Sequence, residues 1–180
     1  MKNIILVTGT PGTGKSDIAK KIAKHYGYEY IHIGDHKDYV VSEGEVKIID
    51  VDKMIKWLQR QQESGDGGLV VDSHLSHYYP AKDTKICIVL RCDPAELKNR
   101  LKLRGYNENK ILINLEAEAM DLILQEALIE KHRVYEIDTT HRTSNSSSQE
   151  AINAIINNEI NYGKTNYNHY LTKLKKPKKA

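Results

Sequence analysis

The sequence predicts an α/β fold in which a five-stranded parallel sheet is flanked by helices. Short apolar runs rich in Ile and Val alternate along the chain with longer segments of helical period, which is the pattern of such a sheet. The length of 180 residues, with 39% hydrophobic and 28% charged residues, is that of one ordinary soluble domain with a single core.

Five runs are strand candidates because each is short and nearly all apolar. They span residues 3–8, 28–33, 68–72, 85–90 and 134–138. Cys87 and Cys92 lie five apart around the fourth run, where a disulfide would be awkward in geometry and a zinc site would lack partners. We therefore expect two buried free thiols.

The segments between the first strands predict helices. Ile18, Ile22 and Tyr26 fall four apart, as the buried face of an amphipathic helix requires. Gly27 follows at the place of a left-handed helix terminator. Residues 52–62 form a second helix candidate.

Further helices are expected in the second half of the chain. Residues 93–103 begin with an Asp-Pro pair, which supplies an N-cap and a first-turn proline. Residues 108–132 are expected to form the longest helix. Near the end, residues 147–150 read as a capping box, so the serine run 146–148 is interpreted as a loop and helix start.

The two ends of the chain differ in character. The first apolar stretch, residues 4–7, is too short and wrongly flanked for a secretory signal, and no run has the length of a membrane span, so a cytoplasmic location is expected. Residues 161–180 hold six lysines and no acidic residue, whereas the rest of the chain is mildly acidic. We therefore expect one domain over residues 1–161 and a basic, flexible tail over residues 162–180.

One motif carries chemistry directly. Residues 9–16 read Gly-Thr-Pro-Gly-Thr-Gly-Lys-Ser and satisfy G-x-x-x-x-G-K-[ST] in full, after a buried-type strand and at the start of an amphipathic helix. This placement predicts a phosphate-binding loop and specifies the fold class as a three-layer P-loop NTPase fold. Its glycines let successive N–H groups, including those of Gly12, Thr13 and Gly14, face phosphates at a helix N-terminus.

Other groups that phosphoryl transfer needs lie close to this loop in the predicted fold. Lys15 is expected to reach the β and γ phosphates of ATP, and Ser16 to ligate Mg²⁺. Asp72 ends an apolar run at the carboxyl end of a neighbouring strand, where a Walker B acid would hold Mg²⁺ through water. The expected cofactor is Mg²⁺, with ATP as co-substrate.

A basic helix end predicts a short lid. Arg100 and Arg104 lie four apart on one helix face, and Gly105 precedes a polar stretch with an available Asn cap. A kinase must neutralise the transferring phosphoryl group and exclude water, and mobile basic segments do this. The same charges would also suit a solvated helix surface.

Several features in this order resemble one family. They are the phosphate-binding loop, Asp72-Ser73-His74 with Pro80, the run from Arg100 to Tyr106 and the run from Asn114 to Glu118. Together they resemble the adenylate kinase isoenzyme six family, also called the coilin-interacting nuclear ATPase family, in its archaeal type. The resemblance extends from residue 3 to about residue 160.

The resemblance implies a fold and two activities. The implied strand order is 2-3-1-4-5, with a monophosphate-binding segment near residues 33–54 and a lid near residues 103–113. The implied function is that of a broad-specificity nucleoside monophosphate kinase with a side ATPase activity. Such proteins also assist maturation of the small ribosomal subunit, so a ribosomal protein and rRNA are implied partners.

The resemblance also assigns site residues. It places ATP contacts on the loop and on an arginine of the lid: Gly12, Gly14, Lys15, Ser16, Asp17 and Arg104. It gives His74 a role in ATP hydrolysis. The loop of residues 138–142, after the last strand, is expected to lie against the adenine, since ligands bind at the carboxyl ends of strands in such sheets.

The acceptor side departs from the family pattern. Relatives offer an arginine just after the Gly-Asp that ends the second strand, whereas residues 34–39 offer only Lys37, a point charge and not a bidentate fork. The acidic stretch that contains Asp50 does match. Lys37 and Asp50 are thus the candidate monophosphate contacts, and AMP, dAMP or CMP the expected acceptors.

Three alternatives belong to other classes. A small GTPase needs N-K-x-D, but Asn109-Lys110 is followed by Ile111 and Leu112. A shikimate-type kinase shares the loop and lid, and residues 65–68 resemble its glycine run, although a tight turn explains these glycines equally well.

The third alternative is an assembly factor that uses ATP hydrolysis to release a ribosomal protein or RNA. In the tail, tyrosines interleave with lysines, a composition that could stack on and neutralise single-stranded RNA. A disordered solubilising tail explains the same composition.

Overall fold

The structure, a computed structural model, describes residues 3–43, 47–65 and 67–174. Its centre is a parallel sheet of five strands in the order β2-β5-β1-β6-β7. These strands are β1 Ile4–Gly9, β2 Glu29–His32, β5 Leu69–Asp72, β6 Thr84–Arg91 and β7 Val134–Asp138. The predicted strands and their order 2-3-1-4-5 are confirmed.

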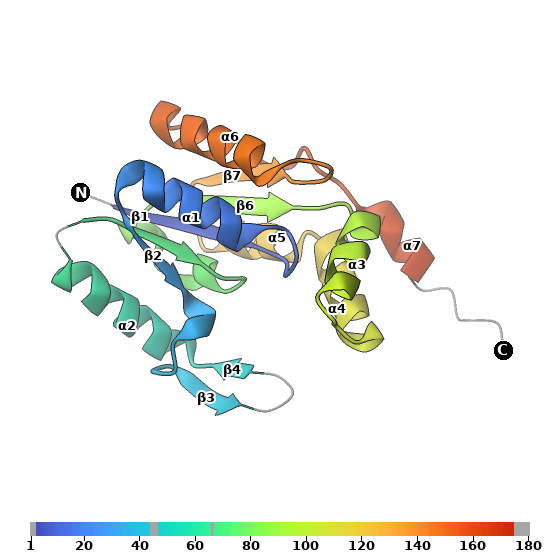
Figure 1. Cartoon of the computed structure of the whole chain (residues 1–180), viewed down its shortest axis with the longest axis horizontal. Coiled ribbons are helices and arrows are strands. Elements are labelled where there is room, and N and C mark those ends of the chain that lie inside the picture. The colour runs from blue at the N-terminus through green and yellow to red at the C-terminus, as the bar shows by residue number, and fades with distance from the viewer. Residues whose placement is uncertain (1–2, 44–46, 66, 175–180) are drawn as a thin grey trace.

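Helices cover both faces of the sheet (Figure 1). On one face, α1 packs beside α6, and on the other lie α2 and α5. The helices are α1 Lys15–Tyr26, α2 Val51–Ser64, α3 Pro94–Leu103, α4 Glu108–Ala119, α5 Leu122–Ile129, α6 Ser144–Asn157 and α7 Leu171–Leu174. Short 3₁₀ helices span η1 Ile33–Asp35, η2 Ser76–Tyr78, η3 Ala81–Asp83 and η4 Asn168–Tyr170.

Alternation along the central strand divides the core into two halves. In β1, Ile5 and Val7 join the cluster under α1 and α6, whereas Ile4 and Leu6 join the cluster under α2 and α5. All four side chains are fully buried, which explains why the run is continuously apolar. Burying one such side chain contributes about 1.5 to 3 kcal/mol.

Local capping signals end and begin the helices as predicted. Gly27 terminates α1 with a left-handed φ of 65°. The Asp93 carboxylate accepts the N–H of Ala95 at 2.8 Å, with Pro94 opening α3. Asn107 caps α4 by accepting the N–H of Lys110 at 2.8 Å.

The helix predicted over residues 108–132 is wrong, because the structure contains two helices there. The chain breaks between α4 and α5 at Asp121, whose φ of 56° lies in the left-handed region. Left-handed backbone is unfavourable for a residue with a side chain. Here the Asp121 carboxylate pairs with the buried guanidinium of Arg91, which stabilises the turn.

The capping box predicted at residues 147–150 is also wrong. The N-cap of α6 lies four residues earlier, at Thr143, whose hydroxyl accepts the N–H of Ser146 at 3.1 Å. Ser147 and Ser148 are buried inside the helix and face the body of the protein.

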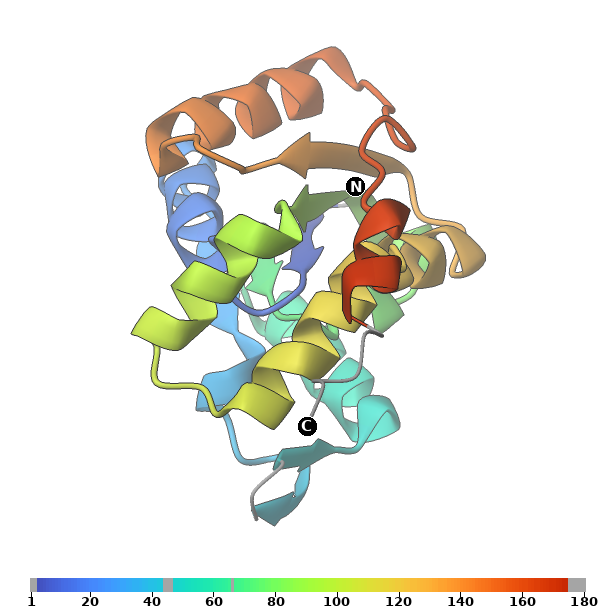
Figure 2. The same cartoon turned by 90° about the vertical axis from the view of Figure 1, so that its right-hand side faces the viewer.

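Residues 161–174 differ from the expected loose tail. Asn161 forms an isolated β-bridge with Tyr135 of β7, and Tyr167 is only 8% exposed. Leu174 packs against the cluster between α3 and α4. Figure 2 shows α7 lying beside α4. Residues 175–180, which hold most of the tail lysines, lie outside the described residues.

Two small units extend from the sheet. The α3–α4 pair packs around Leu97, Leu101 and Ile111. Strands β3 Val40–Glu43 and β4 Lys47–Ile49 form a separate antiparallel sheet between β2 and α2 (Figure 1), a hairpin that the sequence analysis missed.

Two other expectations concern the described part of the chain. Cys87 and Cys92 are buried free cysteines, as predicted. Within residues 3–43, 47–65 and 67–174, no helix combines the length and apolarity needed to cross a membrane.

Candidate active site

The phosphate-binding loop joins β1 to α1 and depends on its glycines. Gly9, Gly12 and Gly14 have φ values of 139°, 95° and 93°, which disfavour residues with a side chain. A Cβ on Gly9 would also lie 2.4 Å from the carbonyl oxygen of Leu90. Thus the sequence motif is required both by backbone conformation and by the close approach of β6.

Lys15 lies folded within this loop. Its side chain is buried, and its Nζ donates to the carbonyl oxygen of Thr10 at 3.1 Å. Burial lowers the pKa of Lys15 to about 8, although the nearby Asp72 carboxylate opposes the shift and Arg104 adds to it. The ammonium is therefore poorly solvated, and an anionic ligand would stabilise it.

The structure brings Ser16 and Asp72 together. The Ser16 hydroxyl donates to Oδ2 of Asp72 at 2.6 Å, although 56 residues separate them. Asp72 is fully buried at the end of β5. Burial alone would raise its pKa, but hydrogen bonds from His32 and Ser16 and the charge of Lys15 bring it below the ordinary value.

Two further residues hold Asp72, and the sequence analysis missed both. The Tyr30 hydroxyl and the His32 Nδ1 each lie 3.0 Å from Oδ2 of Asp72. Both come from β2, where they alternate along the strand, and His32 is paired directly opposite Asp72. The hydrogen bond to Asp72 raises the pKa of His32. The signal was an alternating polar pair on a strand predicted to neighbour β5.

The donor set at this point fits Mg²⁺. Ser16 and Asp72 present oxygen atoms, the ligands that Mg²⁺ prefers. Oδ2 of Asp72 is held by three donors, whereas its Oδ1 is buried and has no hydrogen-bond partner among the described residues. A buried carboxylate oxygen without a partner is costly and suits a metal-bound water.

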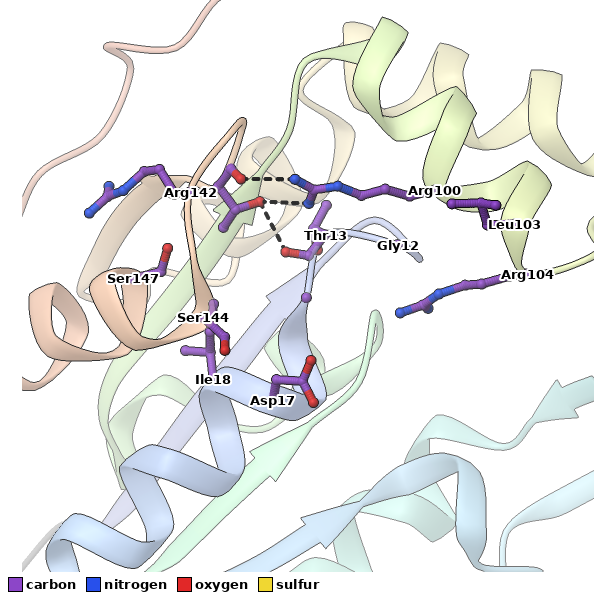
Figure 3. Close-up of a pocket in the computed structure, with 12 residues that line it drawn as sticks. Gly12, Thr13, Asp17, Ile18, Arg100, Leu103, Arg104, Arg142, Ser144 and Ser147 are labelled. Atoms are coloured by element: carbon purple, nitrogen blue, oxygen red, sulfur yellow. Dashed lines mark hydrogen bonds between the residues drawn. The ribbon is translucent and has the colours of Figure 1, made fainter.

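A cavity of about 410 Å³ opens beside the loop (Figure 3). Its walls come from the loop, the end of α3 and the segment after β7. The lining residues are Gly12, Thr13, Gly14, Asp17, Ile18, Arg100, Leu103, Arg104, Thr139, Arg142, Ser144 and Ser147. Gly12, Thr13 and Gly14 of the predicted loop, together with Asp17, Arg104 and part of the 138–142 loop, therefore meet at one cavity. The predicted residues Lys15, Ser16 and Asp72 are not among its lining residues.

Three arginines line this cavity, and they are held differently. Arg100 donates to the carbonyl oxygen of Thr139 at 3.0 Å and pairs with Glu96, and Arg142 pairs with Glu150 at 2.6 Å. Arg104 is exposed and points into the cavity near Gly12 (Figure 3). Within the described residues no ion pair is found for its guanidinium, so its charge is available to a ligand.

Other predicted residues lie outside the cavity. His74 is exposed, yet close enough to Lys15 and Asp72 that their charges act on its ring. Lys37 is exposed in the turn before β3. The Asp50 carboxylate caps α2 by accepting the N–H of Lys53 at 3.0 Å. The structure does not bring Lys37 and Asp50 to the phosphate-binding loop's cavity.

Comparison with protein families and sequences gives consistent results. Residues 5–121 match the model of the AAA domain family. A protein of Thermococcus kodakarensis named "Putative adenylate kinase" is 42% identical over 158 residues, covering 84% of this chain and 85% of that protein. A protein of the same name from Pyrococcus furiosus is 39% identical over 160 residues, covering 86% of this chain and 82% of the relative.

Solved structures share the fold at low sequence identity. Shikimate kinase from Acinetobacter baumannii superimposes with a TM-score of 0.63 at 14% identity, covering 88% of this chain and 96% of its own. Deoxyadenosine kinase from M. mycoides gives a TM-score of 0.58 at 16% identity, covering 87% and 100%. The sheet, the helices and the loop are thus those of a P-loop kinase fold.

Proposed function

Since the chain belongs to the AAA domain family and to the family of archaeal proteins named "Putative adenylate kinase", we propose that it transfers the γ-phosphoryl group of Mg-ATP to a nucleoside monophosphate. The observation that carries this proposal is the convergence of Lys15, the Ser16–Asp72 pair and Arg104 at the phosphate-binding loop. Two cationic side chains, and a pair of oxygen ligands suited to Mg²⁺, are the groups that a bound triphosphate needs around its phosphates.

The proposed mechanism is direct in-line transfer without a covalent enzyme intermediate. The loop N–H groups and Lys15 bind and orient the triphosphate, which pre-pays the entropy of bringing the reactants together. Arg104 stabilises the charge that develops on the transferring group. The segment that joins α3 to α4, about residues 103–113, acts as the lid and excludes water from the site.

Mg²⁺ would be held by Ser16 directly and by Asp72 through water, and when bound it neutralises charge on the β and γ phosphates. Tyr30 and His32 keep the Asp72 carboxylate in place by occupying Oδ2. Oδ1, which has no hydrogen-bond partner among the described residues, would then be left for a water bound to the ion, and this supports the proposed indirect contact.

The acceptor site is proposed at residues 33–54, with Lys37 and Asp50 as contacts. We infer broad specificity with AMP, dAMP and CMP as acceptors, because a lysine supplies charge without the fixed geometry of an arginine fork. His74, near Lys15, is proposed to support a slow side ATPase activity. A cytoplasmic role in small-subunit assembly, as in the isoenzyme six family, belongs to the same proposal.

One acceptor screen tests the function. Purified protein is incubated with Mg-ATP and each of AMP, dAMP, CMP and shikimate, and diphosphate, shikimate phosphate and free phosphate are separated and measured. Diphosphate formation that disappears in Lys15→Ala supports the proposal. Slow phosphate release that no monophosphate alters would instead favour an assembly ATPase, and phosphorylation of shikimate alone would favour a small-metabolite kinase.

A further inference from the structure

The run from Asn114 to Glu118 has no part in the site described above, yet it ends on an unusual residue. Glu118 lies near the end of α4 and is only 2% exposed. Its Oε1 accepts from the Nε of Arg91 at 2.8 Å and from the N–H of Cys92 at 3.0 Å. Its Oε2 accepts from the hydroxyl of Thr10, inside the phosphate-binding loop.

Stability alone does not explain this buried carboxylate. Arg91 is surrounded by the carboxylates of Glu118, Asp121 and Glu136, so the cluster buries more negative than positive charge. Removing charges from water is costly, and well-packed apolar residues often stabilise a fold as well as a buried ion pair does. The surplus charge is compensated by N–H and O–H donors, of which the Thr10 hydroxyl belongs to the candidate active site.

Thr10 in turn organises the loop. Its carbonyl oxygen accepts from Lys15 Nζ at 3.1 Å, from the Thr13 hydroxyl at 2.8 Å and from the Thr13 N–H at 3.3 Å. Thr10 is 2% exposed, so its side chain has little freedom once its hydroxyl is bound. Because the hydroxyl is held in place, the Thr10 carbonyl group, to which Lys15 and Thr13 donate, is held in place as well.

The same carboxylate belongs to the return helix of the α3–α4 pair. Helix α4 begins at Glu108, and Glu118 follows ten residues later, about 15 Å along the axis. We propose that Glu118 is a positioning residue that holds the phosphate-binding loop through the Thr10 hydroxyl and joins it to α4. The proposal rests on the proposed function only in that the loop binds a nucleotide.

Substitutions at Thr10 separate this link from the ion pair. Thr10→Val removes the hydroxyl, keeps the shape and leaves Arg91 paired with Glu118. Its Kd for ADP, measured by calorimetry on folded protein, is expected to rise about tenfold, the scale of one hydrogen bond to a charged group. Thr10→Ser keeps the hydroxyl and is expected to recover most of the lost affinity.

Glu118→Gln tests the same link from the other side and is useful if Thr10→Val does not fold. It is expected to weaken ADP binding and raise the KM for ATP, while the KM for the acceptor changes little. The matched control is Glu116→Gln, on the same helix and half-buried, which is expected to leave the Kd unchanged.

The outcomes keep this inference apart from the proposed function. If the folded Thr10→Val and Glu118→Gln variants bind ADP as tightly as the natural chain, the positioning role is wrong, whatever the transfer assay shows. If the natural chain binds ADP but phosphorylates no monophosphate, the proposed function fails, and the Kd values still decide the role of Glu118.

Discussion

The donor side and the acceptor side of the candidate site are built in different ways. On the donor side, residues 9–16 follow one another along the chain directly after a buried strand, and Gly12, Thr13 and Gly14 line a defined cavity. On the acceptor side, β3 and β4 form a separate small sheet outside the main one, where Val41 is 62% and Ile48 54% exposed. The donor side is continuous with the core, whereas the acceptor side reaches the core through residues that flank the hairpin, namely Ile33, Tyr39 and Met54.

The two sides also differ in the kind of group that binds the substrate. Backbone N–H groups form the donor side, and their direction follows from glycine positions in the sequence. The acceptor side depends on separate side chains, of which Asp50 is already bound to its own helix start. Substitutions are therefore expected to reduce transfer strongly at the donor side and weakly at the acceptor side.

The largest effect is expected for Lys15→Met. The lysine is only 9% exposed, so its charge acts on phosphate with little screening by water. The kcat for transfer should fall on the order of 1,000-fold, at the upper end for loss of one electrostatic group. The kcat is measured from the diphosphate formed in timed, quenched reactions, with Lys24→Met on the exposed face of α1 as control. A Lys15→Met enzyme with half the natural rate would contradict the comparison.

Arg104→Ala is expected to have the next largest effect. The kcat should fall on the order of 100-fold, less than for Lys15 because the arginine is exposed and partly screened. The Kd for ATP should change little, since the contact is proposed to form mainly during transfer. Lys98→Ala, exposed on α3, the helix that Arg104 terminates, is the control. An equal loss of ATP binding and kcat would argue against a lid.

Tyr30→Phe and His32→Asn should have intermediate effects. Each removes or weakens a hydrogen bond to Asp72, and partners behind a metal ligand typically affect metal affinity about 10-fold or more. The Mg²⁺ concentration for half-maximal rate should rise about 10-fold, with kcat at saturating Mg²⁺ nearly unchanged. Tyr28→Phe on the same segment is the control. An unchanged Mg²⁺ requirement in both variants would mean that Asp72 needs no such support.

The smallest effect is expected at Lys37. Lys37→Ala should raise the KM for the acceptor about fivefold, which corresponds to an exposed charge contact of about 1 kcal/mol. Lys37→Arg should lower the same KM, because a guanidinium can bind phosphate through two hydrogen bonds. Initial rates at varied AMP measure both. If Lys37→Ala reduced transfer as much as Arg104→Ala, the two sides would be equally constrained and the comparison would fail.

Much of the fold was determined by the sequence itself. The apolar runs predicted all five strands of the main sheet, and Gly27 and the Asp93-Pro94 pair predicted helix ends. The glycine loop and the strand-end position of Asp72 were predicted as well. These signals share one property: each is a backbone preference or a burial pattern of consecutive residues, so no distant partner is needed to interpret it.

Other features depended on tertiary contacts. The break at Asp121 and the burial of Tyr167 both depend on contacts with Arg91 at the end of β6, and the support of Asp72 depends on Tyr30. The link from Glu118 to Thr10 joins residues 108 positions apart. Such pairs are decided by strand register and by how helices pack, because a hydrogen bond forms only when both groups arrive within about 3 Å with the correct direction. The sequence supplied the groups, and the packing of the sheet and helices decided which of them meet.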